Sequence, residues 1–433
     1  MLKRNRLPFG SPMSQVALAA TVMAISVMGD SLLYTVLPSR LTEFGLVAGA
    51  GVGLVLSVNR WVRLATNGWA AWIYRRFGLR WPFLVSLVLA FVTTATYGLH
   101  HGFWLLLAAR IGWGFCFSIQ QVTTYMVVLR CDPLDRGKGM GLFNAIFRSG
   151  SLLAVLLGGL VADFLGVRAA FLGFASLIIC ALPLVLMIDE GRPDSQLTLV
   201  TQNGNDKIAV SGKSRFTDQV WRVLVGTAEF PHSDRYRSLA VNYLRFTNTL
   251  VVSGLIGATL GFLIEERLGM SADIMGTIVG ATSLTGFVLG TSRAIEVGSS
   301  VYFGRLSDKV GREPLLRACI PIIVIVTLLI TIDSVFPLIV GVPIVFAATT
   351  AGKVTLDASA GDLAPLRYRA QVMGRYATWT DLGAALGPLA GYGMIQFFPL
   401  IWVYVAAVFL PLSGLGFYTF AFTNREGNDE IKK

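Results

Sequence analysis

Ten ionisable side chains lie inside long apolar segments of this chain, where a charge costs about 3 kcal/mol or more and needs a partner or a water-filled cavity. Six are cations and four are anions: Arg60, Arg63, Arg110, Arg148, Arg293 and Lys353 against Asp30, Glu296, Asp357 and Asp381. Guanidinium groups bind carboxylate or phosphate through two parallel hydrogen bonds. The positive excess therefore predicts a site for a small anionic or carboxylate-bearing molecule.

Asp30 is the acid in the first apolar segment, and two interpretations of it stay open. It can neutralise Arg60 or Arg110 as a fixed ion pair. Alternatively, a partly desolvated carboxylate beside an arginine can exchange a proton when the arginine moves away. Asp381 and Glu296 are the other candidates for proton coupling.

The candidates for substrate binding are the polar and aromatic residues at membrane depth: Arg60, Arg63, Arg110, Arg148, Arg293, Gln120, Lys353 and Tyr34. Further aromatic residues that could line a pocket are Trp61, Trp113, Tyr125, Tyr376 and Trp379. Arg148 and Asp381 are expected to face each other near the cavity. Lys353 with Asp357, and Arg293 with Glu296, can instead neutralise each other within one helix, because such residues lie one turn apart.

The charged pattern occurs twice, at an offset of 233 residues (293 − 60). The matched pairs are Arg60 with Arg293, Arg63 with Glu296, Gly78 with Gly311, and Arg148 with Asp381. Two homologous halves with charges inside apolar helices are typical of a transporter that rocks around a central site.

The elements that must position these residues are apolar helices. Hydrophobic residues make up 54% of the 433 residues and charged residues 14%. Crossing a hydrocarbon core of about 30 Å takes roughly 20 residues in a helix. Twelve apolar runs meet this length approximately: 14–37, 49–73, 82–99, 103–127, 139–165, 169–188, 243–264, 274–297, 315–331, 336–354, 372–397 and 401–422. We therefore expect an all-α membrane protein with twelve transmembrane helices in two pseudo-symmetric six-helix bundles.

The domain organisation follows from these runs. The N-terminal bundle is predicted at 1–189, a polar cytoplasmic connector at 190–239, the C-terminal bundle at 240–423 and a cytoplasmic tail at 424–433. The net charge of +11 gathers in alternate loops, which by the positive-inside rule predicts an inner-membrane protein with both termini in the cytoplasm. This distribution reflects topology, so no nucleic-acid partner is expected.

Segment 304–312, with Gly304, Asp308, Gly311 and Arg312, resembles the loop signature of the major facilitator superfamily. Arg110 with Gly114, and a pattern formed by Gly383, Gly387, Pro388 and Gly391, resemble two helix motifs of that family. In the counterpart of the loop signature, Arg75 replaces the usual acid. The resemblance implies a one-sided conformational latch at Asp308 and close helix packing at the glycines, with a bend at the proline.

Resemblance to proton antiporters, through Asp30, Arg110 and the glycine pattern of 150–159, favours proton-driven export of a small organic solute, either carboxylate-bearing or amphipathic. Proton-coupled uptake of an organic anion is the alternative, and a membrane sensor that does not transport is a third hypothesis. No nucleotide-binding, catalytic or metal-ligand pattern is recognisable, so we expect no enzyme activity, no metal and no cofactor beyond the proton gradient. The expected partners are the solute, protons and the lipid bilayer, and the chain is expected to be a monomer.

Overall fold

The computed structural model is almost entirely helical and describes residues 11–99, 102–132, 135–190, 232–274, 277–363 and 369–423. The first half contains α1 (Pro12–Val36), η1 (Leu41–Phe44), α2 (Ala50–Phe77), α3 (Arg80–Leu99), α4 (Phe103–Val128), α5 (Arg136–Leu165), α6 (Val167–Cys180) and α7 (Leu182–Leu186). The second half contains α10 (His232–Asn248), η2 (Thr249–Ile256), α11 (Gly257–Leu268), β1 (Ser271–Ile274), β2 (Thr277–Gly280), α12 (Ala281–Val310), α13 (Arg312–Ile330), α14 (Phe336–Asp362), α15 (Arg369–Ile395), α16 (Leu400–Ala407) and α17 (Phe409–Thr423).

Helices dominate because a chain in lipid must satisfy each backbone N–H and C=O within the segment itself. Helix α1 begins after Ser11, whose side-chain oxygen accepts a hydrogen bond from the N–H of Ser14 (3.2 Å). Pro12 occupies the first turn, where its missing N–H is not needed. The antiparallel strands β1 and β2 form a short hairpin directly before α12.

Nine helical segments of the described chain are long and apolar enough to cross a membrane: Pro12–Val36, Arg80–Leu99, Phe103–Val128, Lys138–Leu165, Val167–Leu186, Arg235–Leu268, Arg312–Ile330, Phe336–Asp362 and Leu400–Thr423. The long helices α2, α12 and α15, which carry Arg60, Arg293 and Asp381, are not among these nine. The helical membrane fold is confirmed, whereas the number of twelve spans stays a prediction.

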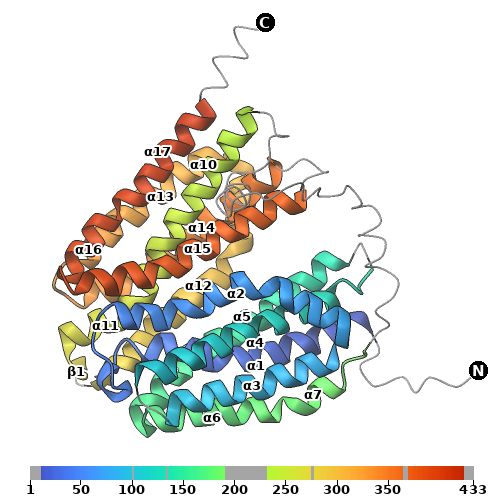
Figure 1. Ribbon diagram of the computed structural model, residues 1–433. Helices are drawn as coiled ribbons and strands as arrows, with labels where there is room; N and C mark the ends of the chain where they lie inside the picture. Colours follow the sequence, from blue (N-terminus) through green and yellow to red (C-terminus); the bar gives the residue numbers. More distant parts are fainter. Residues whose placement is uncertain are drawn as a thin grey trace, which may run out of the picture.

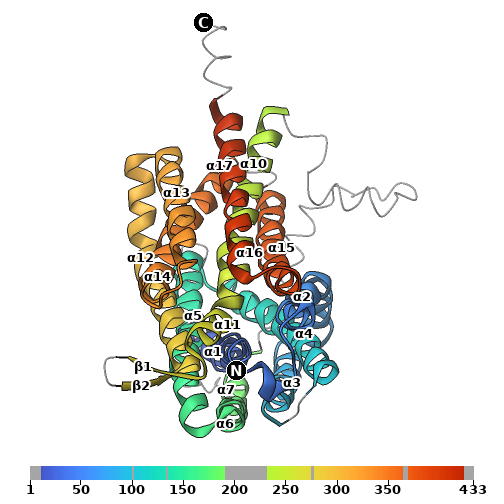
Figure 2. The same cartoon turned by 90° about the vertical axis from the view of Figure 1, so that its left-hand side faces the viewer.

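Each half packs around apolar cores of its own. In the first half α1 packs against α5, and α4 packs against α2 and α3; in the second, α14 packs against α12 and α13, and α15 packs against α10. The main contacts between the halves are those of α5 with α12 and of α2 with α15, and α1 also touches α11 and α12. Figures 1 and 2 show the halves meeting near α11 and the hairpin and diverging toward the start of α5.

The predicted domain boundaries stay predictions. Helix α10 begins at His232, inside the predicted connector 190–239. The remainder of that connector lies almost wholly outside the described residues, and the tail 424–433 lies outside them completely.

The repeat is visible in the backbone where α2 and α12 end. Gly78 (φ 77°) follows α2 and Gly311 (φ 96°) follows α12. The N–H of Gly78 donates to the Tyr74 oxygen (3.0 Å), and that of Gly311 donates to the Ser307 oxygen (3.1 Å). Because L side chains rarely adopt such φ angles, glycine suits this sharp exit from a helix.

A π-helical stretch interrupts the first long helix of the second half. Segment η2 joins α10 to α11 and lies against α15. A π-helix closes its hydrogen bonds over one residue more than an α-helix, and such stretches frequently occur at functional sites.

Candidate functional site

A cavity of about 360 Å³ lies between the two halves. The first half lines it with α1, α2, α4 and α5, and the second with η2, α11, α12 and α15. Predicted site residues that line it are Asp30, Tyr34, Arg60, Arg63, Arg148, Arg293, Glu296 and Asp381. The cavity therefore gathers most of the charges that the sequence places at membrane depth.

Asp30 is held by a network that joins α1, α2 and α4. The fully buried Arg110 donates through Nη1 to Asp30 Oδ1. Its Nε and Nη2 donate to the backbone oxygens of Val55 (2.9 Å) and Leu56 (3.1 Å). Asn59 Nδ2 also donates to Asp30 Oδ1 (3.2 Å). Of the two arginines considered for Asp30, Arg110 is the one that forms the ion pair.

Glu296 on α12 is surrounded by three cations. It accepts hydrogen bonds from Arg148 Nη1 (2.7 Å), Arg293 Nη1 (2.9 Å) and Lys353 Nζ (3.0 Å). Charge-assisted bonds of this kind are about twice as strong as neutral ones. Because Arg148 belongs to α5, this cluster joins the two halves beside the cavity.

Arg148 and Asp381 both line the cavity, but the ion pair of Arg148 is with Glu296. The reason is that α5 packs on α12 whereas α15 packs on α2, so helices related by the repeat belong to different contacts between the halves. Lys353 also bonds Glu296 instead of Asp357, which accepts from the Tyr376 hydroxyl (2.5 Å).

Arg60 and Arg63 on α2 form no salt bridge with any residue that the structure describes, and the Nε atom of each has no hydrogen-bond partner there. Both interact electrostatically with the carboxylate of Asp381. The Arg63 guanidinium lies 4.0 Å from the centre of the Phe117 ring, a cation–π contact. Asp30, which is already paired with Arg110, also interacts with both guanidinium groups, and the Tyr34 hydroxyl interacts with Arg60.

An aromatic wall faces the cavity from α4 and α5. It consists of Phe117, Tyr125, Phe143 and Phe147. Phe143 and Phe147 are stacked at 5.7 Å between ring centres, Tyr125 meets the edge of Phe143 at 5.6 Å, and Phe117 meets Phe147 at 6.0 Å. Sequence reasoning identified Tyr125 but missed the three phenylalanines. The spacing of Phe143 and Phe147 by one helical turn was the available signal.

Some predicted site residues lie away from the cavity lining. Arg110 and Lys353 act through Asp30 and Glu296. Gln120 is fully buried in α4, and neither of its amide atoms has a partner within the described chain.

The glycines of α15 bring that helix close to the first helix of its half. Gly383 lies against the backbone oxygen of Phe246, and Gly391 lies against the side chain of Leu255. Between them, Gly387 touches the backbone of Gly254 in η2. Pro388 lies inside the helix directly after this contact. Without side chains, glycines let helix backbones approach each other.

The first half contains matching contacts. Gly150 of α5 lies against the backbone oxygen of Ala24 in α1, and Gly158 lies against the side chain of Leu32. Gly150 and Gly158 are the residues that the repeat pairs with Gly383 and Gly391. Both halves therefore use the same glycine positions to pack their first and fifth long helices.

The residues of the loop signature contact other residues of the second half. The Asp308 side chain is 73% exposed and lies 4.0 Å from Arg312, which in turn donates through Nε to Asp362 (2.6 Å). Gly304 lies near Val354. The role of Asp308 as a latch between the halves stays a prediction.

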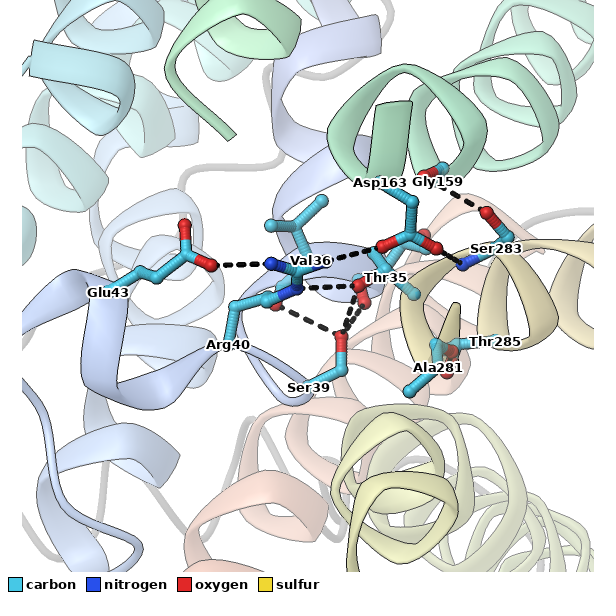
Figure 3. Close-up of polar contacts among 11 residues, drawn as sticks. Thr35, Val36, Ser39, Arg40, Glu43, Gly159, Asp163, Ala281, Ser283 and Thr285 are labelled. Atoms are coloured by element: carbon cyan, nitrogen blue, oxygen red, sulfur yellow. Dashed lines mark hydrogen bonds and ion pairs between the residues drawn. The ribbon is translucent and has the colours of Figure 1, made fainter. Parts of the chain in front are cut away.

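A polar cluster joins the halves at one end of the cavity, which we call the closed end (Figure 3). Arg40, after α1, donates to Glu43 (2.6 Å) and to Asp163 of α5 (2.6 Å). Asp163 also accepts from the backbone N–H of Ser283 at the start of α12 (2.7 Å), where the helix dipole favours an anion. Burial lowers the pKa of Arg40, but its bonds to Glu43 and Asp163 outweigh this and raise it overall, so Arg40 stays charged. The sequence analysis did not single out this cluster.

Tight backbone contacts also close this end, and two of them are related by the repeat. A Cβ atom added to Gly286 of α12 would lie 2.5 Å from the backbone oxygen of Val155 in α5. A Cβ atom added to Gly53 of α2 would lie 2.5 Å from that of Pro388 in α15. Both members of these contacts are related by the repeat, at an offset of 233 residues (286 − 53). One contact between the pseudo-symmetric halves is thus made twice, and Gly159 of α5 adds a further close approach to the backbone oxygen of Thr282 in α12.

A family model described as Major Facilitator Superfamily matches residues 19–295 and 246–433. This chain belongs to the Major Facilitator Superfamily. The family resemblance of the loop and helix motifs is confirmed. The coarse function follows as well, because this is a family of secondary transporters and not of enzymes.

Relatives of this superfamily member match only part of its length. A probable vesicular acetylcholine transporter-B of Danio rerio is 24% identical over 194 residues, which is 42% of this chain and 39% of that protein. A synaptic vesicular amine transporter of Rattus norvegicus is 28% identical over 34% of this chain and 29% of its own length. An uncharacterized MFS-type transporter, YhcA of Bacillus subtilis, is 25% identical over 38% of this chain and 31% of its own length. Each match thus spans well under half of the relative.

Solved structures show the same fold at low identity. A POT family transporter in complex with 5-aminolevulinic acid has a TM-score of 0.72 at 14% identity, covering 96% of this chain and 98% of that one. A bacterial homolog of the human lysosomal transporter Spinster, inward-facing and unoccupied, has a TM-score of 0.65 at 15% identity and covers 95% of each chain. These likenesses support the fold, while the substrate must be argued from the cavity.

Proposed function

We propose that this superfamily member exports a small carboxylate-bearing or amphipathic organic solute in exchange for protons, by alternating access. The observation that carries the proposal is the Asp30–Arg110 ion pair in the wall of a cavity with more cations than anions. The proton gradient is the proposed energy source, and no other cofactor is invoked.

The geometry supports a role for Asp30 as the group that takes up the proton. Arg110 is fixed to α2 by two backbone oxygens and needs Asp30 to balance its charge. Neutralising Asp30 removes the bond that ties α1 to α4, because a protonated acid no longer attracts the guanidinium. A proton on Asp30 would thereby change how α1 is held beside the cavity.

The two ends of the cavity support alternating access. The hydrogen bonds between described residues of the two halves belong to the closed end or to the Arg148–Glu296 pair. A solute leaving at the closed end requires these bonds to separate. By the positive-inside prediction, the closed end faces away from the cytoplasm, and the protein lies in the inner membrane with both termini inside.

Proton-coupled import of an organic anion is the second candidate, because the same cations serve an anion moving in either direction. The names of the relatives mention acetylcholine and amines, and their matches cover too little of each chain to transfer a substrate. A sensor that uses the fold without transport is the third candidate.

The experiment that tests export compares cells that lack the chain with cells that carry the wild type, Asp30→Asn or Asp333→Asn. Asp333 is a matched control, because its side chain is 91% exposed. Untargeted mass spectrometry of cells and medium should find a compound that leaves the cell only with the wild type and Asp333→Asn. Full efflux with Asp30→Asn would remove Asp30 as the coupling group, and depletion of a compound from the medium would show import.

A further inference from the structure

The cavity combines a guanidinium pair with an aromatic wall, and this combination restricts what can bind. Its volume of about 360 Å³ is near the lower limit of ligand pockets, about 300–1,000 Å³, so it admits one small organic molecule. The charges and rings that line it specify the chemistry of that molecule.

The carboxylates of the cavity are already served by cations. Asp30 bonds Arg110, and Glu296 accepts from three cations. Asp381 is the remaining carboxylate in the lining, and it interacts with both Arg60 and Arg63. An amine would have to displace one of these cations, so the cavity disfavours a cationic ligand.

The guanidinium groups of Arg60 and Arg63 are available to an anion. They lie almost one turn apart on α2, and no salt bridge joins either of them to a described residue. Both interact electrostatically with Asp381 and more weakly with Asp30, and Arg60 also interacts with the Tyr34 hydroxyl. Arg148 and Arg293, in contrast, already donate to Glu296. A carboxylate at Arg60 and Arg63 would therefore form charge-assisted bonds without breaking an existing salt bridge among the described residues.

The rings beside this pair offer a surface for a flat apolar group. Phe117 connects the two features, because Arg63 lies on its face and Phe147 meets its edge. Phe143 continues the wall by stacking on Phe147, and Tyr125 packs against Phe143. A ring seated here gains stacking contacts while its acid group reaches α2.

We propose that the cavity binds a small aromatic carboxylate, with its acid group on Arg60 and Arg63 and its ring against Phe117, Tyr125, Phe143 and Phe147. This proposal names the substrate class for the proposed transport function and rests on it. It sets the ligand apart from the cations named in the vesicular relatives.

The test measures binding to the full chain in lipid nanodiscs by calorimetry, with 2-naphthoate as the probe. Three matched probes accompany it: 2-naphthylmethylamine carries the opposite charge, 2-naphthalenemethanol carries none, and acetate lacks the ring. We expect 2-naphthoate to bind at least about ten-fold more tightly than each of the three, since ten-fold corresponds to about 1.4 kcal/mol. Equal or tighter binding of the amine would overturn the proposal without any variant.

Variants locate the site. Arg60→Gln, Arg63→Gln and Phe147→Leu should each weaken 2-naphthoate binding about ten-fold or more, while Lys138→Gln, whose side chain is 77% exposed, should leave it unchanged. Loss of binding in Arg148→Gln together with full binding in Arg60→Gln and Arg63→Gln would place the acid group at the Glu296 cluster and refute the assignment. Each variant is checked for a monodisperse elution profile. Arg60→Lys keeps the positive charge but removes the planar guanidinium fork, and it should also weaken 2-naphthoate binding.

Failure of this proposal and failure of transport are distinguishable, because the binding assay needs no gradient. If cells export a compound that has no aromatic acid, and 2-naphthoate does not bind, the ligand class is wrong and export stands. If 2-naphthoate binds with the expected ranking while no compound crosses the membrane with the wild-type chain, the site stands and the transport function is wrong.

Discussion

Replacing Gly286 by alanine should weaken the closed end. The new Cβ atom would lie 2.5 Å from the Val155 backbone oxygen, closer than real Cβ atoms approach other atoms, so α12 and α5 must separate. Overpacking of this kind costs about 1–3 kcal/mol. Since about 1.4 kcal/mol corresponds to a factor of ten, the closed end should open about 5- to 150-fold more often.

Thiol labelling measures this opening. In a chain whose native cysteines Cys116, Cys131, Cys180 and Cys319 are replaced by serine, a single cysteine is placed at Thr35, which is fully buried beside Gly286. A membrane-impermeant maleimide should then react about 5- to 150-fold faster in Gly286→Ala than in the background chain, because the labelling rate follows the open population.

The control is Gly298→Ala on the same helix, where an added Cβ meets nothing within 4 Å. It should label like the background chain. Gly53→Ala should accelerate labelling as Gly286→Ala does, because it makes the repeat-related contact with Pro388. Equal rates for Gly286→Ala and Gly298→Ala would show that the contact with Val155 does not hold the closed end together.

Three further predictions concern the polar clusters. Glu296→Gln leaves three clustered cations without their anion and should lower stability by about 3–5 kcal/mol, read as a lower Tm, with part of the loss recovered by adding Lys353→Gln. Asp163→Asn should speed maleimide labelling at the closed end, and the labelling rate should no longer depend on salt concentration. A labelling rate that depends on salt as it does in the wild type would contradict the role of this carboxylate. Tyr376→Phe should cost about 1–3 kcal/mol in thermal unfolding by leaving Asp357 without its hydroxyl donor, and an unchanged Tm would refute that bond.

The sequence predicted the residues of the cavity better than their pairing. Charges such as Arg60 and Asp381 are conspicuous in apolar helices, so their depth could be inferred from the sequence alone. Their partners could not, because the repeat relates Arg148 to Asp381 by symmetry, whereas contact between the halves joins α5 to α12. The ion pairs depend on which helices become neighbours across the interface between the halves, and the internal repeat does not determine those neighbours.

The closed end illustrates a second limit. Arg40 lies in a loop and Asp163 lies near the end of an apolar helix, where charges are ordinary. Only the folded chain brings them together with the N-terminus of α12. The three phenylalanines of the aromatic wall were missed for a similar reason: the one-turn spacing of Phe143 and Phe147 puts them on one face of α5, but it does not say whether that face meets lipid, core or cavity.

The π-helical stretch η2 coincides with one extra residue in the second half. The glycine contacts of α5 fall on Ala24 and Leu32, eight positions apart, while the equivalent contacts of α15 fall on Phe246 and Leu255, nine positions apart. The second copy therefore contains one more residue between two fixed points, and the wider π turn takes it up without moving either contact.

This register gives Asp30 a counterpart. Counting from either contact places Asp30 opposite Val252 or Ser253, and of these two Ser253 lines the cavity. Equivalent positions of the two halves thus hold a carboxylate in one and a hydroxyl in the other. A hydroxyl does not ionise in the range where a carboxylate does, so at this pair of positions the first half can carry a charge and the second cannot.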